Sequence, residues 1–359
     1  MREAHSVLDA PQAVAYLLGW GLIAPTGVVD GEMVVVDASR RNHNLAVISR
    51  GGPGYLLKQP RDERAVAALA NEAAVYGWLG GSDSWFAGYL PTVHRYEPGG
   101  PLVLEYLAGH ETMRHRIGRR GRFPQAHGRL AGRALAELHR YRRPPGASPV
   151  ADLAVPWVLT LDRPELALFR DFQGARTQVL RIIQQHPEFS TGFARLRRRW
   201  HCRVLVHNDV RWDNLLVPVA AGAGLRIVDW ELAGWGDPAW DVGAMLAQYL
   251  TCWVTSMPAS AALDPTTTLA LARYPLAKMQ PAIRACWLGY QRHAEPGSVG
   301  LVPATEYAAA TLVQIAVERA ASTSHVDGVA TVLLQVSANM LRWPADAAAS
   351  LLGLAWDDR

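Results

Sequence analysis

The most informative segment of the chain reads Val204-Leu-Val-His-Asn-Asp-Val-Arg-Trp-Asp-Asn-Leu-Leu-Val217. Its first apolar residues predict a short strand, and this strand leads Asp209 into a polar loop. Asn214 follows Asp209 by five positions. A second β-like run, Leu225–Asp229, also ends in a carboxylate. The sequence therefore places two carboxylates and one amide at the ends of neighbouring strand-like segments.

These side chains are the ones that phosphoryl transfer from a nucleotide requires. We expect Asp209 to orient an acceptor hydroxyl and to take its proton. We expect Asn214 and Asp229 to hold Mg²⁺, a hard cation that prefers oxygen ligands. Strands on both sides of the loop would hold these groups rigidly, and positioning supplies much of such a catalyst's power. Either motif alone could be a chance arrangement of loop residues, but their order and spacing together favour a kinase.

The chain resembles the aminoglycoside phosphotransferase and choline kinase group, which is related to the protein kinases. That group carries His-Gly-Asp-x-x-x-x-Asn followed by Asp-x-Glu or Asp-x-Asp, and here the matching segments are His207–Asn214 and Asp229–Glu231. The segment Gly236-Asp-Pro-Ala-Trp-Asp241 also resembles the group, and the resemblance implies that Asp241 braces the catalytic loop. Asn208 stands where the family has glycine. Asparagine tolerates left-handed backbone angles better than most residues, so we expect the loop to be retained.

The resemblance also implies a lysine on the third strand, paired with a glutamate on the next helix, that holds the nucleotide's phosphates. The chain has 36 lysines and arginines, and all but Lys58 and Lys278 are arginines. Lys58 ends the third expected strand and Glu72 lies in the middle of the next expected helix, so we assign the pair to them. Glu63 is the alternative partner, although acids are favoured in the first turn of a helix in any case.

Further nucleotide contacts follow from the same resemblance. The loop Asp37–Asn44 lacks the Gly-x-Gly-x-x-Gly of protein kinases, but the family often uses a loop with serine and asparagine. Ser39 and Asn42 would then meet phosphate, with a plain polar hairpin as the alternative. Backbone groups of Glu105 and Leu107 would meet adenine.

The periodicity of apolar residues predicts a helix, three strands of an antiparallel meander, a second helix and two more strands in the first part of the chain. In that order they are Asp9–Leu18, Glu32–Asp37, Asn44–Ser49, Gly54–Gln59, Asp62–Leu79, Thr92–Tyr96 and Leu102–Tyr106. The rest is mainly helical, with an amphipathic helix at Gln125–Tyr141 and helices rich in alanine and leucine from Val242 onward. We therefore expect an α+β, bilobal protein-kinase-like fold. The predicted lobes are a nucleotide-binding lobe at 1–106 and a helical lobe with the catalytic loop and acceptor site at 107–359.

Composition narrows the class of protein. Half of the 359 residues are apolar, 19% are charged and the mean hydropathy is zero, which excludes a disordered, collagen-like or coiled-coil protein. Three cysteines without CxxC spacing argue against a disulfide framework or a zinc site. The polar start, and the lack of any apolar run of about 18 residues, lead us to expect a cytoplasmic protein that does not contact the membrane.

The net charge of +4 comes largely from two arginine clusters, at Arg114–Arg122 and Arg195–Arg203. No RNA-binding aromatic signature or zinc-finger spacing accompanies them, so we do not expect a nucleic-acid partner. Enzymes that bind aminoglycosides must attract polycations, and a basic chain argues against such an acceptor. A local acidic pocket can nevertheless coexist with a basic exterior.

The sequence leaves two classes of phosphoryl acceptor open. One is a small-molecule hydroxyl on an aminoglycoside, a sugar or an amino alcohol. The other is a serine or threonine of a biosynthetic precursor peptide, because Val210–Asn214 and Gly236–Asp241 also resemble the stand-alone kinases of class V lanthipeptide and thioamitide pathways. There, a partner lyase eliminates the phosphate. In either class the cofactors would be ATP and Mg²⁺. An inactive kinase fold that serves as a binding or scaffold protein is a third alternative, and the retained polar residues argue against it.

Overall fold

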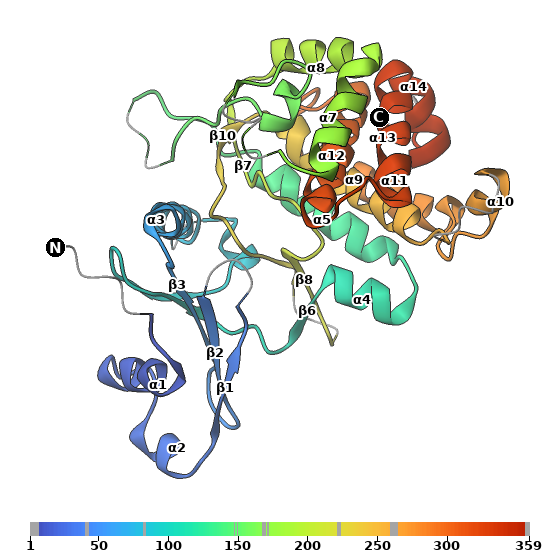
Figure 1. Ribbon diagram of the computed structural model, residues 1–359. Helices are drawn as coiled ribbons and strands as arrows, with labels where there is room; N and C mark the ends of the chain where they lie inside the picture. Colours follow the sequence, from blue (N-terminus) through green and yellow to red (C-terminus); the bar gives the residue numbers. More distant parts are fainter. Residues whose placement is uncertain are drawn as a thin grey trace. The chain divides into compact units, whose positions relative to one another are not determined.

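The structure is a computed structural model, and it describes residues 7–39, 43–81, 84–146, 148, 150–166, 170, 172–220, 224–258 and 265–355. The chain divides into two compact units, and Figure 1 labels their helices and strands. Unit 1 comprises Met1–Met113 and Asn214–Ala233, and unit 2 comprises Arg114–Asp213 and Gly234–Arg359. We describe each unit by itself.

Unit 1 is built on an antiparallel sheet of five strands in the order β1-β2-β3-β5-β4. Figure 1 labels β1, β2 and β3 of this sheet. The strands are β1 (Met33–Asp37), β2 (His43–Ser49), β3 (Tyr55–Gln59), β4 (Val93–Tyr96) and β5 (Leu102–Glu105). The predicted three-stranded meander is therefore confirmed. Lys58 lies on the central strand β3, opposite Asn44 on one side and Leu102 on the other.

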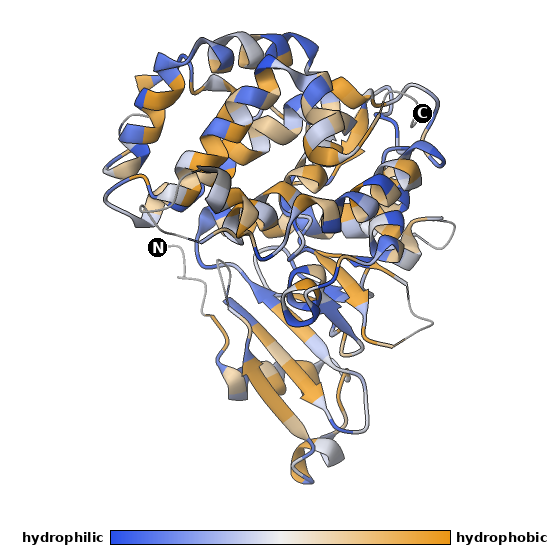
Figure 2. Cartoon of the chain, turned by 90° about the vertical axis from the view of Figure 1, so that its right-hand side faces the viewer, coloured by the Kyte–Doolittle hydropathy of each residue, from blue (hydrophilic) through white to orange (hydrophobic). Residues whose placement is uncertain are grey.

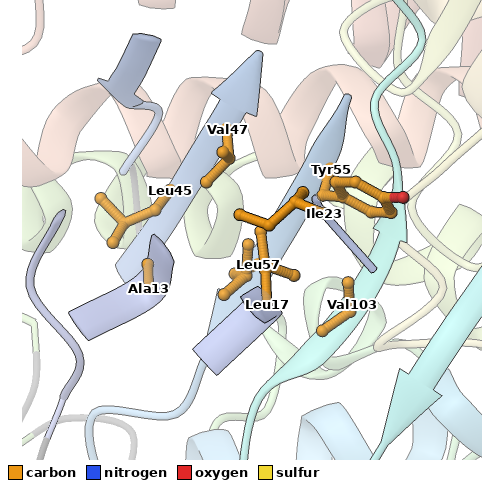
Figure 3. Close-up of a cluster of buried hydrophobic side chains, with 8 residues drawn as sticks. All are labelled: Ala13, Leu17, Ile23, Leu45, Val47, Tyr55, Leu57 and Val103. Atoms are coloured by element: carbon orange, nitrogen blue, oxygen red, sulfur yellow. The ribbon is translucent and has the colours of Figure 1, made fainter. Parts of the chain in front are cut away.

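Helix α1 (Ala10–Gly19) covers one face of this sheet and is followed by the short α2 (Pro25–Val29). A capping box starts α1, because the Asp9 carboxylate accepts from the Gln12 N–H and the Gln12 side chain accepts from the Asp9 N–H, both at 2.9 Å. The apolar side chains of α1 then pack on those of the sheet. Figure 3 shows this cluster, which consists of Ala13, Leu17, Ile23, Leu45, Val47, Tyr55, Leu57 and Val103.

Helix α3 (Glu63–Leu79) begins at Asp62, whose side chain accepts from the Ala65 N–H. Successive side chains of a strand point to opposite faces, so Lys58 points away from the face that holds Tyr55 and Leu57. Glu72 of α3 reaches Lys58, which places α3 on the face opposite α1.

A second sheet of unit 1 was not predicted in full. It pairs β6 (His110–Thr112), β8 (Leu215–Pro218) and β9 (Arg226–Ile227) in the order β6-β8-β9. Only β9 lies inside a predicted strand. The sheet ties residues from Asn214 onward to β6, so unit 1 extends past residue 106 and takes in a later segment, unlike the predicted division. Strands this short leave no alternating pattern in the sequence, which is why β6 and β8 were missed.

Unit 2 is mainly helical, and Figure 2 shows polar and apolar residues on different sides of its outer helices. Its helices α4 to α9 are α4 (Met113–Arg120), α5 (Gln125–Leu138), α7 (Ala175–Gln185), α8 (Pro187–Arg199) and α9 (Pro238–Thr255). The later helices are α10 (Pro265–Ala270), α11 (Leu276–Gln291), α12 (Leu301–Arg319), α13 (Gly328–Arg342) and α14 (Pro344–Ala347). Strands β7 (Val204–Val206) and β10 (Gly234–Gly236) form an antiparallel pair. In the described part of the chain, no helix has the length and apolarity to cross a membrane.

Three arginines of the second arginine cluster are paired with acids of unit 2. Arg195 and Arg199 of α8 both bind Glu306 of α12, whose side chain is 1% exposed. Arg197 makes two hydrogen bonds to the Asp162 carboxylate, at 2.5 and 3.0 Å. These three arginines therefore join elements of unit 2 through ion pairs.

Helices α5 and α11 approach each other backbone to backbone through glycines. A Cβ on Gly132 of α5 would overlap the carbonyl oxygen of Cys286 on α11, and a Cβ on Gly289 of α11 would overlap that of Arg129. Only glycine leaves room for such a close approach. The two helices therefore have to pack as one pair.

We expect Gly132→Ala to destabilise the protein, because its methyl group meets a backbone that cannot rotate away; overpacking typically costs about 1–3 kcal/mol. Gly77→Ala is the matched control, since Gly77 is exposed on α3 and a Cβ there meets nothing within 4 Å. It should leave stability unchanged or raise it by about 0.5–1 kcal/mol. Urea denaturation of both variants tests this, and equal midpoints would contradict the packing argument.

Candidate active site

Three of the predicted side chains meet in unit 1. The Lys58 ammonium donates to both carboxylate oxygens of Glu72, at 2.8 and 2.7 Å, and to Oδ1 of Asp229 at 2.7 Å. The side chains of Lys58 and Glu72 are 7% and 0% exposed, whereas that of Asp229 is 35% exposed. A buried cation thus bridges one buried carboxylate and one that reaches solvent. Glu72, not Glu63, is the partner of the lysine.

The electrostatics keep this lysine charged. Burial by itself would lower the pKa of Lys58, but the neighbouring Glu72 and Asp229 carboxylates outweigh burial and raise the pKa above its ordinary value. Burial acts in the opposite sense on Glu72 and raises the pKa of its carboxyl, against the pull of Lys58. At neutral pH the bridge is therefore a charged ammonium between acids.

Backbone contacts fix the direction of Asp229. Its φ of 71° lies in the left-handed region, which few non-glycine residues adopt. On one side of it, the Val228 N–H donates to the Asn214 carbonyl at 3.1 Å. On the other, the Trp230 N–H lies 3.4 Å from Oε1 of Glu72. The carboxylate is therefore held at a sharp bend whose two sides are both tied down.

Sequence reasoning missed Asn71. Its side-chain amide donates to the carbonyl oxygens of Glu231 and Ala233, at 3.2 and 2.9 Å. Helix α3 therefore contacts the segment after Asp229 through two successive residues, Asn71 and Glu72. The only signal in the sequence was the position of Asn71 beside the predicted glutamate.

The donor set of Asn214 and Asp229 fits Mg²⁺. Asn214 is buried at the start of β8, and its carbonyl is bound to the residue before Asp229. An amide oxygen and a carboxylate are hard ligands, and Mg²⁺ in phosphate-transferring sites usually takes one or two carboxylates and completes its shell with phosphates and water.

The other predicted nucleotide contacts lie at three places in unit 1. Ser39 is held within its hairpin, because its N–H donates to Asp37 at 2.8 Å and its hydroxyl accepts from the Asn44 N–H at 3.1 Å. Asn42 lies outside the described residues. Glu105 ends β5 and its carboxylate accepts from the N–H and hydroxyl of Thr92, both at 3.0 Å, and Leu107 follows two residues later.

In unit 2, strand β7 leads into the predicted catalytic loop. Asn208 has a φ of 66° and so adopts the left-handed backbone that the sequence required of it. The fully buried Asp241 accepts the N–H groups of His207 and Asn208, at 2.7 and 2.9 Å. His139 lies 3.3 Å from Asp241. Asp241 therefore braces the loop, as the resemblance implied.

Asp209 faces a cleft in unit 2. The Arg211 guanidinium donates to Oδ1 of Asp209 at 2.6 Å and lies 3.7 Å from a carboxylate oxygen of Glu318 on α12. Trp240 and Gln248 of α9 and Thr311 and Gln314 of α12 also line the cleft. The sequence offered a signal for Arg211, two positions after Asp209. It offered none for Glu318, which lies far along the chain.

The family is shown by a direct comparison. The model of the phosphotransferase enzyme family matches residues 33–279, more than half of the chain, and the chain belongs to this family. The family consists of phosphotransferase enzymes, which confirms the predicted enzyme class. No curated protein sequence matches the chain.

Solved structures share the fold at low sequence identity. An ethanolamine kinase of Plasmodium vivax is 11% identical with a TM-score of 0.55, covering 98% of this chain and 92% of its own. A choline kinase of Cryptosporidium parvum is 12% identical with a TM-score of 0.56, covering 96% and 99%. The ADP-bound aminoglycoside phosphotransferase APH(2'')-Ib is 14% identical with a TM-score of 0.52, covering 93% and 99%. These similarities confirm the α+β, protein-kinase-like fold.

We expect Lys58→Met to destabilise the protein, because it leaves Glu72 buried without its cation, a loss that typically costs about 3–5 kcal/mol. The loss should shrink as the pH falls, since burial raises the pKa of Glu72 and its protonated form carries no uncompensated charge. Lys278→Met, at an exposed position of α11, is the matched control. Urea denaturation at two pH values measures both, and a Lys58→Met protein as stable as the control would show that the bridge contributes nothing.

Proposed function

We propose that this protein transfers the γ-phosphoryl group of ATP, bound as its Mg²⁺ complex, to the hydroxyl group of a small molecule. The observation that carries the proposal is the Lys58 ammonium held between Glu72 and Asp229. A buried lysine with one carboxylate behind it and one open to solvent is suited to hold phosphates beside a metal ligand.

Each unit contributes separate roles in this proposal. In unit 1, Lys58 would contact the phosphates, Glu72 would position Lys58, and Asn214 and Asp229 would hold Mg²⁺. The bound metal would neutralise charge on the phosphate oxygens. Ser39, Asn42 and the backbone of Glu105 and Leu107 are the proposed further contacts to the nucleotide.

In unit 2, Asp209 would accept the proton of the acceptor hydroxyl. The acceptor oxygen then forms a bond to the γ-phosphorus, the bond from that phosphorus to the bridging oxygen breaks, and ADP leaves. Arg211 fixes one oxygen of the Asp209 carboxylate and so sets its orientation toward the cleft. Positioning of this kind supplies much of the rate in phosphoryl transfer.

Two features of the helices after Val242 and of the second arginine cluster favour a small acceptor. The choline and ethanolamine kinase structures cover 96–98% of this chain. The helices after Val242 therefore belong to the shared fold and are not an added peptide-binding module. Three arginines of the second cluster are paired with Glu306 and Asp162, so they do not offer a surface for an acidic leader peptide. The cleft beside Asp209 presents both a cation and an acid, which suits a compact polar alcohol such as a sugar, an amino alcohol or an aminoglycoside.

A peptide acceptor is the second candidate, and one feature of unit 2 favours it. The first arginine cluster lies on α4 and just after it, with Arg114, Arg119, Arg120 and Arg122 exposed. Arg114 also binds Asp213, at the end of the catalytic loop, at 2.5 Å. An acidic precursor peptide could lie along this basic helix with its serine or threonine at Asp209. Such a cytoplasmic lanthipeptide-type kinase would need a partner lyase to eliminate the phosphate.

Two variants should separate binding from chemistry. Asp209→Asn is expected to lower kcat by at least a thousandfold while leaving ATP affinity nearly unchanged, since it removes only the proton acceptor. Asp229→Ala is expected to abolish Mg²⁺-dependent ATP binding itself. Calorimetric titration with ATP, with Mg²⁺ or with EDTA, and measurement of ADP release test both. Loss of nucleotide binding in Asp209→Asn would contradict the assigned roles.

Acceptor-dependent ADP release should rise with one or more small alcohols from a panel of sugars, amino alcohols and aminoglycosides. The triple variant Arg119→Gln/Arg120→Gln/Arg122→Gln should leave this activity unchanged, because these side chains lie outside the cleft. If instead only a precursor peptide is phosphorylated, by mass spectrometry, and the triple variant raises its KM, the peptide candidate replaces the small-molecule one.

A further inference from the structure

Unit 2 holds a second cavity, separate from the cleft at Asp209 and sharing no lining residue with it. Its volume is about 200 Å³, several times the roughly 30 Å³ that a water molecule takes up in the liquid. The cavity lies between the end of α5, the segment that leads into β7 and the turn after α11. Its polar lining includes Arg140, Arg142, His201, Arg203, Glu295 and Ser298.

The charge of this lining is positive. Three guanidinium groups, of Arg140, Arg142 and Arg203, face a single carboxylate, that of Glu295, which binds Arg142. His201 adds an imidazole whose Nδ1 is buried and has no hydrogen-bond partner within the described residues. The other ring nitrogen of His201, Nε2, lies 4.0 Å from a carboxylate oxygen of Asp237. The charge that the cavity offers to a ligand is therefore that of its arginines.

The arginines stand on a fixed backbone. Arg142 forms a β-bridge with Val204, and the Arg143 N–H donates to the Arg203 carbonyl at 3.0 Å. The Arg203 N–H lies 3.3 Å from the carbonyl of Gly236 on β10. Arg142 and Arg203 therefore project from paired segments, and their spacing is set before any ligand binds.

We propose that this cavity is a binding site for a small molecule that carries phosphate groups. Guanidinium groups match phosphate oxygens in two-pronged hydrogen bonds, and three of them around one cavity provide charge for more than one phosphate. The residues that line the cavity include no lysine and no second carboxylate that could hold a metal beside Glu295, so the cavity suits binding and not phosphoryl transfer.

Pyrophosphate is the probe that tests the proposal. We would titrate it calorimetrically into the full chain at fixed ionic strength, with the nucleotide site saturated by ADP and without added Mg²⁺. The wild-type protein should bind one equivalent. Arg203→Gln and Arg142→Gln should each weaken that binding at least tenfold. Arg181→Gln, at an exposed position on α7, is the control for overall charge and should bind like the wild type.

The variant Glu295→Gln distinguishes loss of the binding site from loss of folding. Removal of the single acid frees Arg142 and should tighten pyrophosphate binding several-fold, which a misfolded protein cannot do. Thermal melting without ligand checks that each variant is folded. Two results would overturn the proposal: no binding under these conditions, or equal weakening in Arg181→Gln and Arg203→Gln. The proposed kinase activity would stand in each of these cases, because it rests on other residues.

Discussion

The arrangement of unit 1 depends on the free-energy cost of burying the Lys58 ammonium. An unpaired ammonium buried in a protein costs much free energy, so Lys58 is held between carboxylates. Those carboxylates come from α3 and from the end of β9. Strand, helix and bend must therefore come together correctly, and Asn71 adds hydrogen bonds beyond the bend. One charge thus aligns three elements that are far apart in the sequence.

Both units have a bend of unusual backbone conformation at or next to a carboxylate. Within the described residues, Asn208 and Asp229 are the non-glycine residues with positive φ. Each follows a strand. The Asn208 N–H donates to the Asp241 carboxylate, and the residues on either side of Asp229 donate to the Asn214 carbonyl and to Glu72. Such conformations cost free energy and persist where the surroundings enforce them, which is typical of functional sites. Asp241 performs this enforcement in unit 2, and Glu72 contributes to it in unit 1.

The contact between Lys58 and Glu72 could be predicted, because the resemblance implies such a pair and the expected strand and helix place both residues. What the sequence could not show depends on pairing between distant segments. Strands β6 and β8 are too short to leave a pattern, and the acids that neutralise the second arginine cluster lie elsewhere in the chain. The net charge of the sequence therefore overstated how basic the surface is. A count of charged residues does not reveal which arginines are paired with acids.

The glycine contact between α5 and α11 connects α11 to the predicted catalytic loop. Helix α5 ends at Leu138, and His139, which caps it, lies 3.3 Å from the Asp241 that braces this loop. Helix α11 packs on α5 without room for a methyl group. The helices from α11 onward therefore cannot be exchanged between relatives independently of α5. Changes of acceptor during evolution would then proceed by replacing side chains along the cleft, such as Glu318 on α12, while the helical scaffold is inherited whole.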